Sequence, residues 1–67
     1  MIYRNQINRE IIVEAFQVPF DLTIYVNGTI GRAYRGDWIV KYPKDITIIG
    51  DNTFTKYFQL VDGPINE

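Results

Sequence analysis

The dipeptide Asn27-Gly28 is the sequence feature that most constrains how this chain folds. Both residue types accept the positive φ angles of a type I′ turn, so an Asn-Gly pair between two β-prone runs predicts a two-residue hairpin. Residues 22–26 and 29–34 are such runs, because they are rich in β-branched and aromatic side chains. The shortest loop places Val26 opposite Thr29 and, at the far end, Leu22 opposite Ala33.

This register divides the hairpin into two faces of different character. One face is apolar and is expected to pack against a core; it carries Leu22, Ile24, Val26 and Ala33. The other face is mixed and is expected to stay partly in contact with water; it carries Thr23, Tyr25, Ile30, Arg32 and Tyr34. The hairpin therefore offers one surface to the protein and another to solvent or a partner.

Further segments have the composition of short strands, namely residues 10–18, 38–42, 46–49 and 58–61. Phe54 and Phe58 stand one helical turn apart, which predicts a short helical turn near residues 53–57. Asp62-Gly63-Pro64 is expected to end the last strand and leave a frayed tail.

Many short strands separated by frequent turns predict a mainly β fold with a single domain, residues 1–67. We expect an SH3-like small barrel or a bent antiparallel sheet of about five strands. The large aromatic side chains expected in its core are Phe16, Trp38, Phe54 and Phe58. Exposed strand edges at residues 23–26 or 46–49 would allow a homo-oligomer.

The chain of 67 residues contains no cysteine and no histidine. It can therefore form no disulfide, Cys/His zinc site, thiolate nucleophile or imidazole base. We expect a protein that is not an enzyme and has no catalytic, cofactor-binding or metal-binding residues. Asp37 follows Gly36 in a turn, where a carboxylate is expected to accept backbone hydrogen bonds.

The balance of charge is close to even, with seven basic and eight acidic residues and a net charge of −1. This argues against a purely electrostatic nucleic-acid binder. Basic residues nevertheless gather in one stretch that holds a single acid, Asp37, and they are Arg32, Arg35, Lys41 and Lys44. A nucleic-acid-binding or nucleotide-binding β-barrel that uses these four residues is one alternative.

Aromatic residues interleave with this basic stretch at even spacing, at Tyr34, Trp38 and Tyr42. If one strand ran through Gly36, the three rings would share a face and could stack on nucleic-acid bases. The opposing interpretation is that a turn at Gly36 divides the three and that Trp38 belongs to the core.

Three motifs follow one another along the chain. The first is Tyr3-Arg4 followed by Ile-Ile-Val-Glu-Ala-Phe-Gln at 11–17, the second is Gly-Asp-Trp-Ile-Val at 36–40, and the third is a closing segment with Phe54 and Phe58. Together they resemble a family of small, uncharacterised bacteriophage proteins. The closing segment departs from that family where Leu60 stands in place of a proline. The resemblance implies a compact, β-rich phage accessory protein and supplies no catalytic residues.

These observations favour a phage-encoded protein that binds a host protein, for example a host defence factor, and inhibits or redirects it by steric occlusion. The expected contact residues are Tyr25, Arg32, Tyr34 and Arg35, because Tyr and Arg are enriched in the anchoring positions of interfaces. No apolar run approaches the about 18 residues of a membrane span, so we expect the host cytoplasm and no membrane partner. A virion or assembly component is a further alternative.

Overall fold

Strands dominate residues 1–61, the part of the chain that the computed structural model describes. The tail predicted beyond Val61 lies outside the described residues. In chain order the elements are β1 (Ile2–Asn5), β2 (Ile12–Gln17), β3 (Leu22–Val26), β4 (Thr29–Ala33), β5 (Trp38–Lys41), β6 (Ile46–Ile49), α1 (Asp51–Tyr57) and β7 (Phe58–Leu60).

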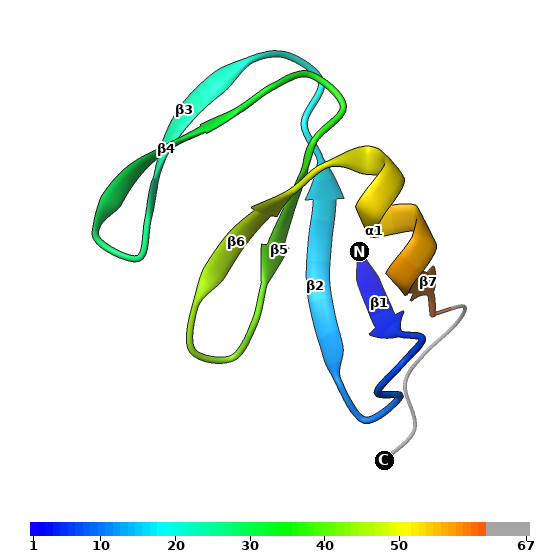
Figure 1. Cartoon of the computed structure of the whole chain (residues 1–67). Coiled ribbons are helices and arrows are strands. Elements are labelled where there is room, and N and C mark those ends of the chain that lie inside the picture. Colours follow the sequence, from blue (N-terminus) through cyan, green and yellow to red (C-terminus); the bar gives the residue numbers. More distant parts are fainter. Residues whose placement is uncertain (62–67) are drawn as a thin grey trace.

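Five strands form one antiparallel sheet in the order β6-β5-β2-β1-β7, and β3 and β4 form a separate hairpin (Figure 1). Strands β2 and β5 are hydrogen-bonded neighbours although the hairpin separates them in the sequence. The prediction of a mainly β domain with one short helix is confirmed. The sheet is open, so within residues 1–61 the barrel alternative does not form.

Strand β1 is an element that the sequence analysis did not predict. It lies between β2 and β7, with Tyr3 opposite Val13 on one side and Leu60 on the other. The strand ends at Asn5, whose Oδ1 accepts hydrogen bonds from the backbone N–H groups of Ile7 and Asn8. A short, polar segment becomes a strand here because two distant strands satisfy its backbone, and this information is absent from the local sequence.

The helix begins at Asp51, two residues before the predicted start, and no side chain caps it. The Asp51 carboxylate instead accepts hydrogen bonds from Trp38 Nε1 at 2.8 Å and Gln17 Nε2 at 3.2 Å. An acidic residue in the first turn also interacts favourably with the helix dipole. Asp51 therefore ties the start of α1 to β2 and β5.

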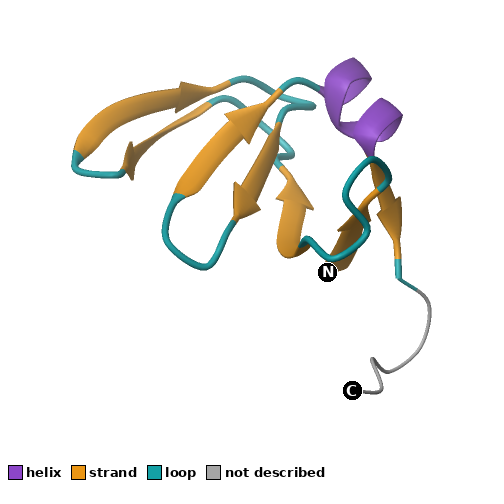
Figure 2. Ribbon diagram, turned by 60° about the horizontal axis from the view of Figure 1, so that its bottom comes forward, coloured by secondary structure: helices purple, strands orange, loops and turns teal. Residues whose placement is uncertain are grey.

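Side chains on β5 divide the core into two clusters on opposite faces of the sheet, because successive residues of a strand point to opposite sides. Val40 belongs to the cluster with Phe54 and Phe58 from α1 and β7. Ile39 belongs to the cluster with Val18 and Ala33, next to the hairpin. Figure 2 shows α1 on one side of the sheet and the hairpin extending from its other end.

We call the cluster with Val40, Phe54 and Phe58 the helix-side cluster, and aromatic rings fill it. The Phe54 ring stacks on Trp38 with centroids 4.0 Å apart and on Phe58 with centroids 4.9 Å apart. Tyr3 meets both Trp38 and Phe54 edge-on. Phe54 is thus the centre of the cluster, and burial of large rings is the main apolar contribution to stability in so small a domain.

The prediction that Phe16 belongs to the core is wrong, because its side chain is 54% exposed. Phe16 lies opposite Ile39 on the sheet face away from α1. That face is only partly covered by the hairpin, so an apolar residue at a strand centre remains at the surface. Phe54 and Phe58 are buried as predicted, and Trp38 is partly buried against them.

Phe54→Ala is expected to lower the free energy of unfolding by about 3–5 kcal/mol, because it removes a buried ring and leaves a cavity. Phe16→Ala is the matched control and is expected to cost less than about 1 kcal/mol. Denaturant unfolding of both variants measures the difference. A larger loss for Phe16→Ala than for Phe54→Ala would contradict this assignment of the core.

Candidate interaction surface

The hairpin forms in the predicted register, with Val26 opposite Thr29 and Leu22 opposite Ala33. The turn residues Asn27 and Gly28 have φ angles of 52° and 84°. Both positive values are those that a type I′ turn requires, and they explain why an Asn-Gly pair stands at this point.

The two faces of the hairpin are as predicted. Leu22, Ile24 and Ala33 pack against Ile39, Ile46 and Ile48 of the sheet. The opposite side, which we call the outer hairpin face, consists of Tyr25, Ile30, Arg32 and Tyr34, all of them exposed. Tyr25 is 75% exposed and its cross-strand partner Ile30 is 69% exposed, so this face presents apolar surface to solvent.

Polar contacts fix the base of the hairpin. Backbone hydrogen bonds join Val18 to Asp37 and Gly36 to Val18, at 2.9 and 3.0 Å. The Asp37 carboxylate accepts a hydrogen bond from the backbone N–H of Tyr34 at 2.9 Å, which confirms the structural role predicted for it. The Asp21 carboxylate accepts one from the N–H of Arg35 at 2.7 Å.

The tip of the hairpin is also fixed. The side-chain amide of Asn27 both donates to the carbonyl of Ile46 and accepts from its N–H, at 3.0 and 3.1 Å. We call this pair of hydrogen bonds the Asn27 clasp. The clasp uses the outward-facing polar groups of Ile46, so at that residue the β6 edge predicted to pair with another chain is already occupied.

All four predicted contact residues are exposed, and they lie in the hairpin or in the turn that follows it; they are Tyr25, Arg32, Tyr34 and Arg35. The guanidinium of Arg32 lies over the Tyr34 ring, 5.6 Å from its centroid. This cation–π contact favours one orientation of both side chains. Ile30 on the same face, and Phe20 in the preceding loop, are exposed residues that the sequence analysis did not select.

The basic residues of the nucleic-acid alternative come from different parts of the fold. Arg32 and Arg35 belong to the hairpin region, Lys41 ends β5 beside Ile46, and Lys44 lies in the turn between β5 and β6. Nor do the three aromatic rings form one platform. Gly36 with φ 94° makes a turn, Trp38 and Tyr42 pack against the helix-side cluster, and Tyr34 is exposed.

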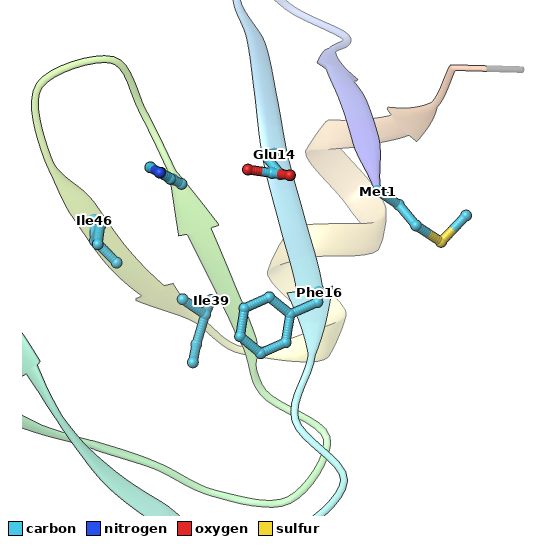
Figure 3. A pocket seen from close by; sticks show the side chains of 6 residues that line it. Met1, Glu14, Phe16, Ile39 and Ile46 are labelled. Atoms are coloured by element: carbon cyan, nitrogen blue, oxygen red, sulfur yellow. The ribbon is translucent and has the colours of Figure 1, made fainter. Parts of the chain in front are cut away.

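A second surface feature is a groove of about 340 Å³ on the sheet face away from α1 (Figure 3). It is lined by Met1, Glu14, Phe16, Ile39, Lys41 and Ile46. Glu14 and Lys41 are cross-strand partners, and they add one acidic and one basic group to an otherwise apolar lining. The groove has the chemistry to receive an apolar side chain next to a polar group.

The sequence analysis missed this groove because its lining comes from Met1, β2, β5 and β6, and only tertiary pairing brings them together. Among residues 1–61, no group of three or more His, Cys, Asp or Glu side chains is arranged to hold a metal ion. In the same range no helix is long and apolar enough to cross a membrane.

Comparison of the chain with protein-family models, curated proteins and solved structures finds no match. The surface therefore has to be interpreted from its own residues.

Beside the Asn27 clasp lies a shallower depression of about 240 Å³, whose lining includes Tyr42 and Asp45. Burial, and to a lesser degree the nearby Asp45 carboxylate, raises the pKa of the Tyr42 hydroxyl above its usual value. The neutral phenol is thus favoured in the folded chain. Ionisation of the Tyr42 hydroxyl is therefore sensitive to the folded structure of the turn between β5 and β6.

Tyr42→Phe is expected to make the free energy of unfolding fall less steeply as the pH rises into the alkaline range. The unfolded chain ionises Tyr42 at a pH near 10, whereas the folded chain retains the proton longer, so this contribution is present below about pH 10 and is lost as the pH rises through the raised pKa. Denaturant unfolding of both proteins between about pH 9 and 11 measures it. Parallel stability profiles for the two proteins would contradict the assignment.

Proposed function

We propose that this chain is a non-enzymatic protein-binding module whose outer hairpin face docks on another protein. As the resemblance to small phage proteins suggests, it would be a phage accessory protein acting in the host cytoplasm on a host protein, for example a defence factor. The observation that carries the proposal is the set of exposed Tyr, Ile and Arg side chains on a hairpin fixed at its base and its tip.

Side-chain chemistry supports this choice of surface. Tyr and Arg are among the residues that contribute most to binding when they are buried at the centre of an interface. Tyr25 and Tyr34 present large areas and have few rotatable bonds, so their ordering on binding costs little entropy. Arg32 is oriented by Tyr34 at 5.6 Å, and a planar guanidinium can make a bidentate contact with a carboxylate of the partner.

A fixed scaffold supports it as well. A loop that becomes ordered on binding loses part of its interaction energy, whereas a preorganised surface does not. Hydrogen bonds that the Asp21 and Asp37 carboxylates accept, and one that the Asn27 amide donates, fix the hairpin before any partner arrives. Phe20, which is 62% exposed next to Asp21, extends the apolar area at the base of the hairpin. Binding at this surface would act by covering a site on the partner.

The first prediction of this proposal concerns capture from phage-infected host lysate. The double variant Ile30→Ala with Arg32→Ala is expected to lose the protein that wild type captures, and the purified pair is expected to bind at least about tenfold more weakly. Tyr34→Ala with Arg35→Ala is expected to act in the same direction. Quantitative affinity capture followed by a binding titration measures both effects.

The matched control is Ile7→Ala with Arg9→Ala, which removes one exposed Ile and one exposed Arg from the loop after β1. Ile7 is 76% exposed, as accessible as Ile30, but lies outside the hairpin. If Ile30→Ala with Arg32→Ala retained as much of the captured protein as Ile7→Ala with Arg9→Ala, the proposed surface would be refuted. Capture of phage structural proteins alone would instead favour a virion or assembly role.

The nucleic-acid alternative makes a different prediction, because phosphate contacts release counterions. If Arg32, Arg35, Lys41 and Lys44 bind a single strand, its affinity falls steeply as salt rises, with a slope on logarithmic axes of about −0.7 per phosphate contact. We expect no measurable binding of a short single-stranded DNA or RNA even at low salt. Tight, salt-dependent binding that Lys41→Ala with Lys44→Ala weakens would replace the protein-binding proposal.

A further inference from the structure

Asn27 combines two roles that are chemically in conflict. Its side-chain amide holds the hairpin tip on Ile46, and among the asparagines of the chain it alone precedes a glycine. We propose that Asn27 is a site of spontaneous deamidation, that the Asn27 clasp restrains the reaction in the folded chain, and that the reaction releases the hairpin tip.

The reaction needs only water. The backbone nitrogen of Gly28 attacks Cγ of Asn27, so that an N–Cγ bond forms, the Cγ–Nδ2 bond breaks, and ammonia leaves with the proton of the attacking nitrogen. Water then opens the five-membered imide at either carbonyl and leaves an aspartate or an isoaspartate. Glycine favours the attack because it has no Cβ, and no atom outside the adjoining chain lies within 4 Å of the position that a Cβ would take.

The clasp opposes this attack in the folded chain. Both polar atoms of the carboxamide are engaged by one residue of β6, through Nδ2 to the Ile46 carbonyl at 3.0 Å and through Oδ1 to its N–H at 3.1 Å. Attack at Cγ makes that carbon tetrahedral and expels Nδ2, so the reaction has to break the hydrogen bonds to Ile46. The rate of deamidation therefore follows how often the hairpin tip opens, which is a local event of low free energy at an exposed turn.

The product cannot rebuild the clasp. An aspartate can still accept the N–H of Ile46, but it has no donor for the Ile46 carbonyl and places a carboxylate oxygen against it. An isoaspartate in addition lengthens the backbone inside a two-residue turn that depends on φ angles of 52° and 84°. Either product loses the hydrogen bond from Asn27 Nδ2 to the Ile46 carbonyl, so the hairpin tip depends more on the apolar packing of its inner side.

The consequence extends to the proposed binding surface, since Tyr25 and Ile30 flank this turn. As deamidation proceeds after synthesis, a growing fraction of the molecules would lose the fixed position of the outer hairpin face. The reaction and the release of the tip are nevertheless measured on the pure chain without any partner. Their failure is thus distinct from failure of the protein-binding proposal.

The test follows the mass gain that accompanies replacement of an amide by a carboxylate, localised by peptide mass spectrometry, in the full chain at mildly alkaline pH. We expect the gain at Asn27 and not at Asn5, Asn8 or Asn52 in the folded chain. We expect it to be about tenfold or more slower in buffer than in guanidinium chloride, where the clasp is absent. Equal rates in the two solvents, or equal reaction of the other asparagines in the folded chain, would overturn the proposal.

Three variants test the role of the clasp. Ile48→Ala removes apolar packing beneath the hairpin and is expected to speed deamidation several-fold, whereas Ile7→Ala, outside the hairpin, is expected to leave it unchanged. Asn27→Asp mimics the product and is expected to raise amide hydrogen exchange at Ile46 and across 22–33, but not in β1 and β2. No acceleration by Ile48→Ala, or unchanged exchange in Asn27→Asp, would also overturn it.

Discussion

The pairing of β2 with β5 is the interaction on which the rest of this structure depends. It joins Glu14–Gln17 to Trp38–Lys41 and encloses the whole hairpin between its two strands. Because successive residues of β5 point to opposite faces, this single ladder places Val40 in the helix-side cluster and Ile39 beneath the hairpin. Both halves of the core thus share one pair of strands.

The same pairing explains how the hairpin becomes a fixed surface. Its two ends leave from adjacent strands, so Val18 and Asp37 meet directly through a backbone hydrogen bond. The inner side then packs on Ile39, Ile46 and Ile48, and the Asn27 clasp fixes the tip. Hydrogen bonds at the base, apolar packing on the inner side and the Asn27 clasp thus position the outer hairpin face. In general, a surface that is already positioned loses less free energy on binding than one that becomes ordered.

The apolar residues of this small fold are divided between a buried core and an exposed surface. The helix-side cluster concentrates its largest rings around Phe54, and burial there supplies most of the apolar stabilisation. The other face of the sheet is only partly covered, so Phe16 and Ile46 line an open groove next to the hairpin. Within residues 1–61, α1 covers one face of the five-stranded sheet and the hairpin covers only part of the other.

The sequence by itself determined the local features of this protein. The Asn27-Gly28 pair set the turn and hence which hairpin residues face inward, and the role of Asp37 in its own turn followed from the same reasoning. These features depend on φ preferences and on neighbouring residues, which the chain carries wherever it folds. The mainly β class followed as well, since turn residues and β-branched runs alternate along the chain.

Only the tertiary structure decided which strands became neighbours. The insertion of β1 between β2 and β7 and the exposure of Phe16 depend on pairings between residues far apart in the sequence. The groove and the Asn27 clasp on Ile46 have the same origin. No local pattern encodes such contacts, because an apolar residue on a strand has the same sequence signature whether the face it points to is later covered or left open.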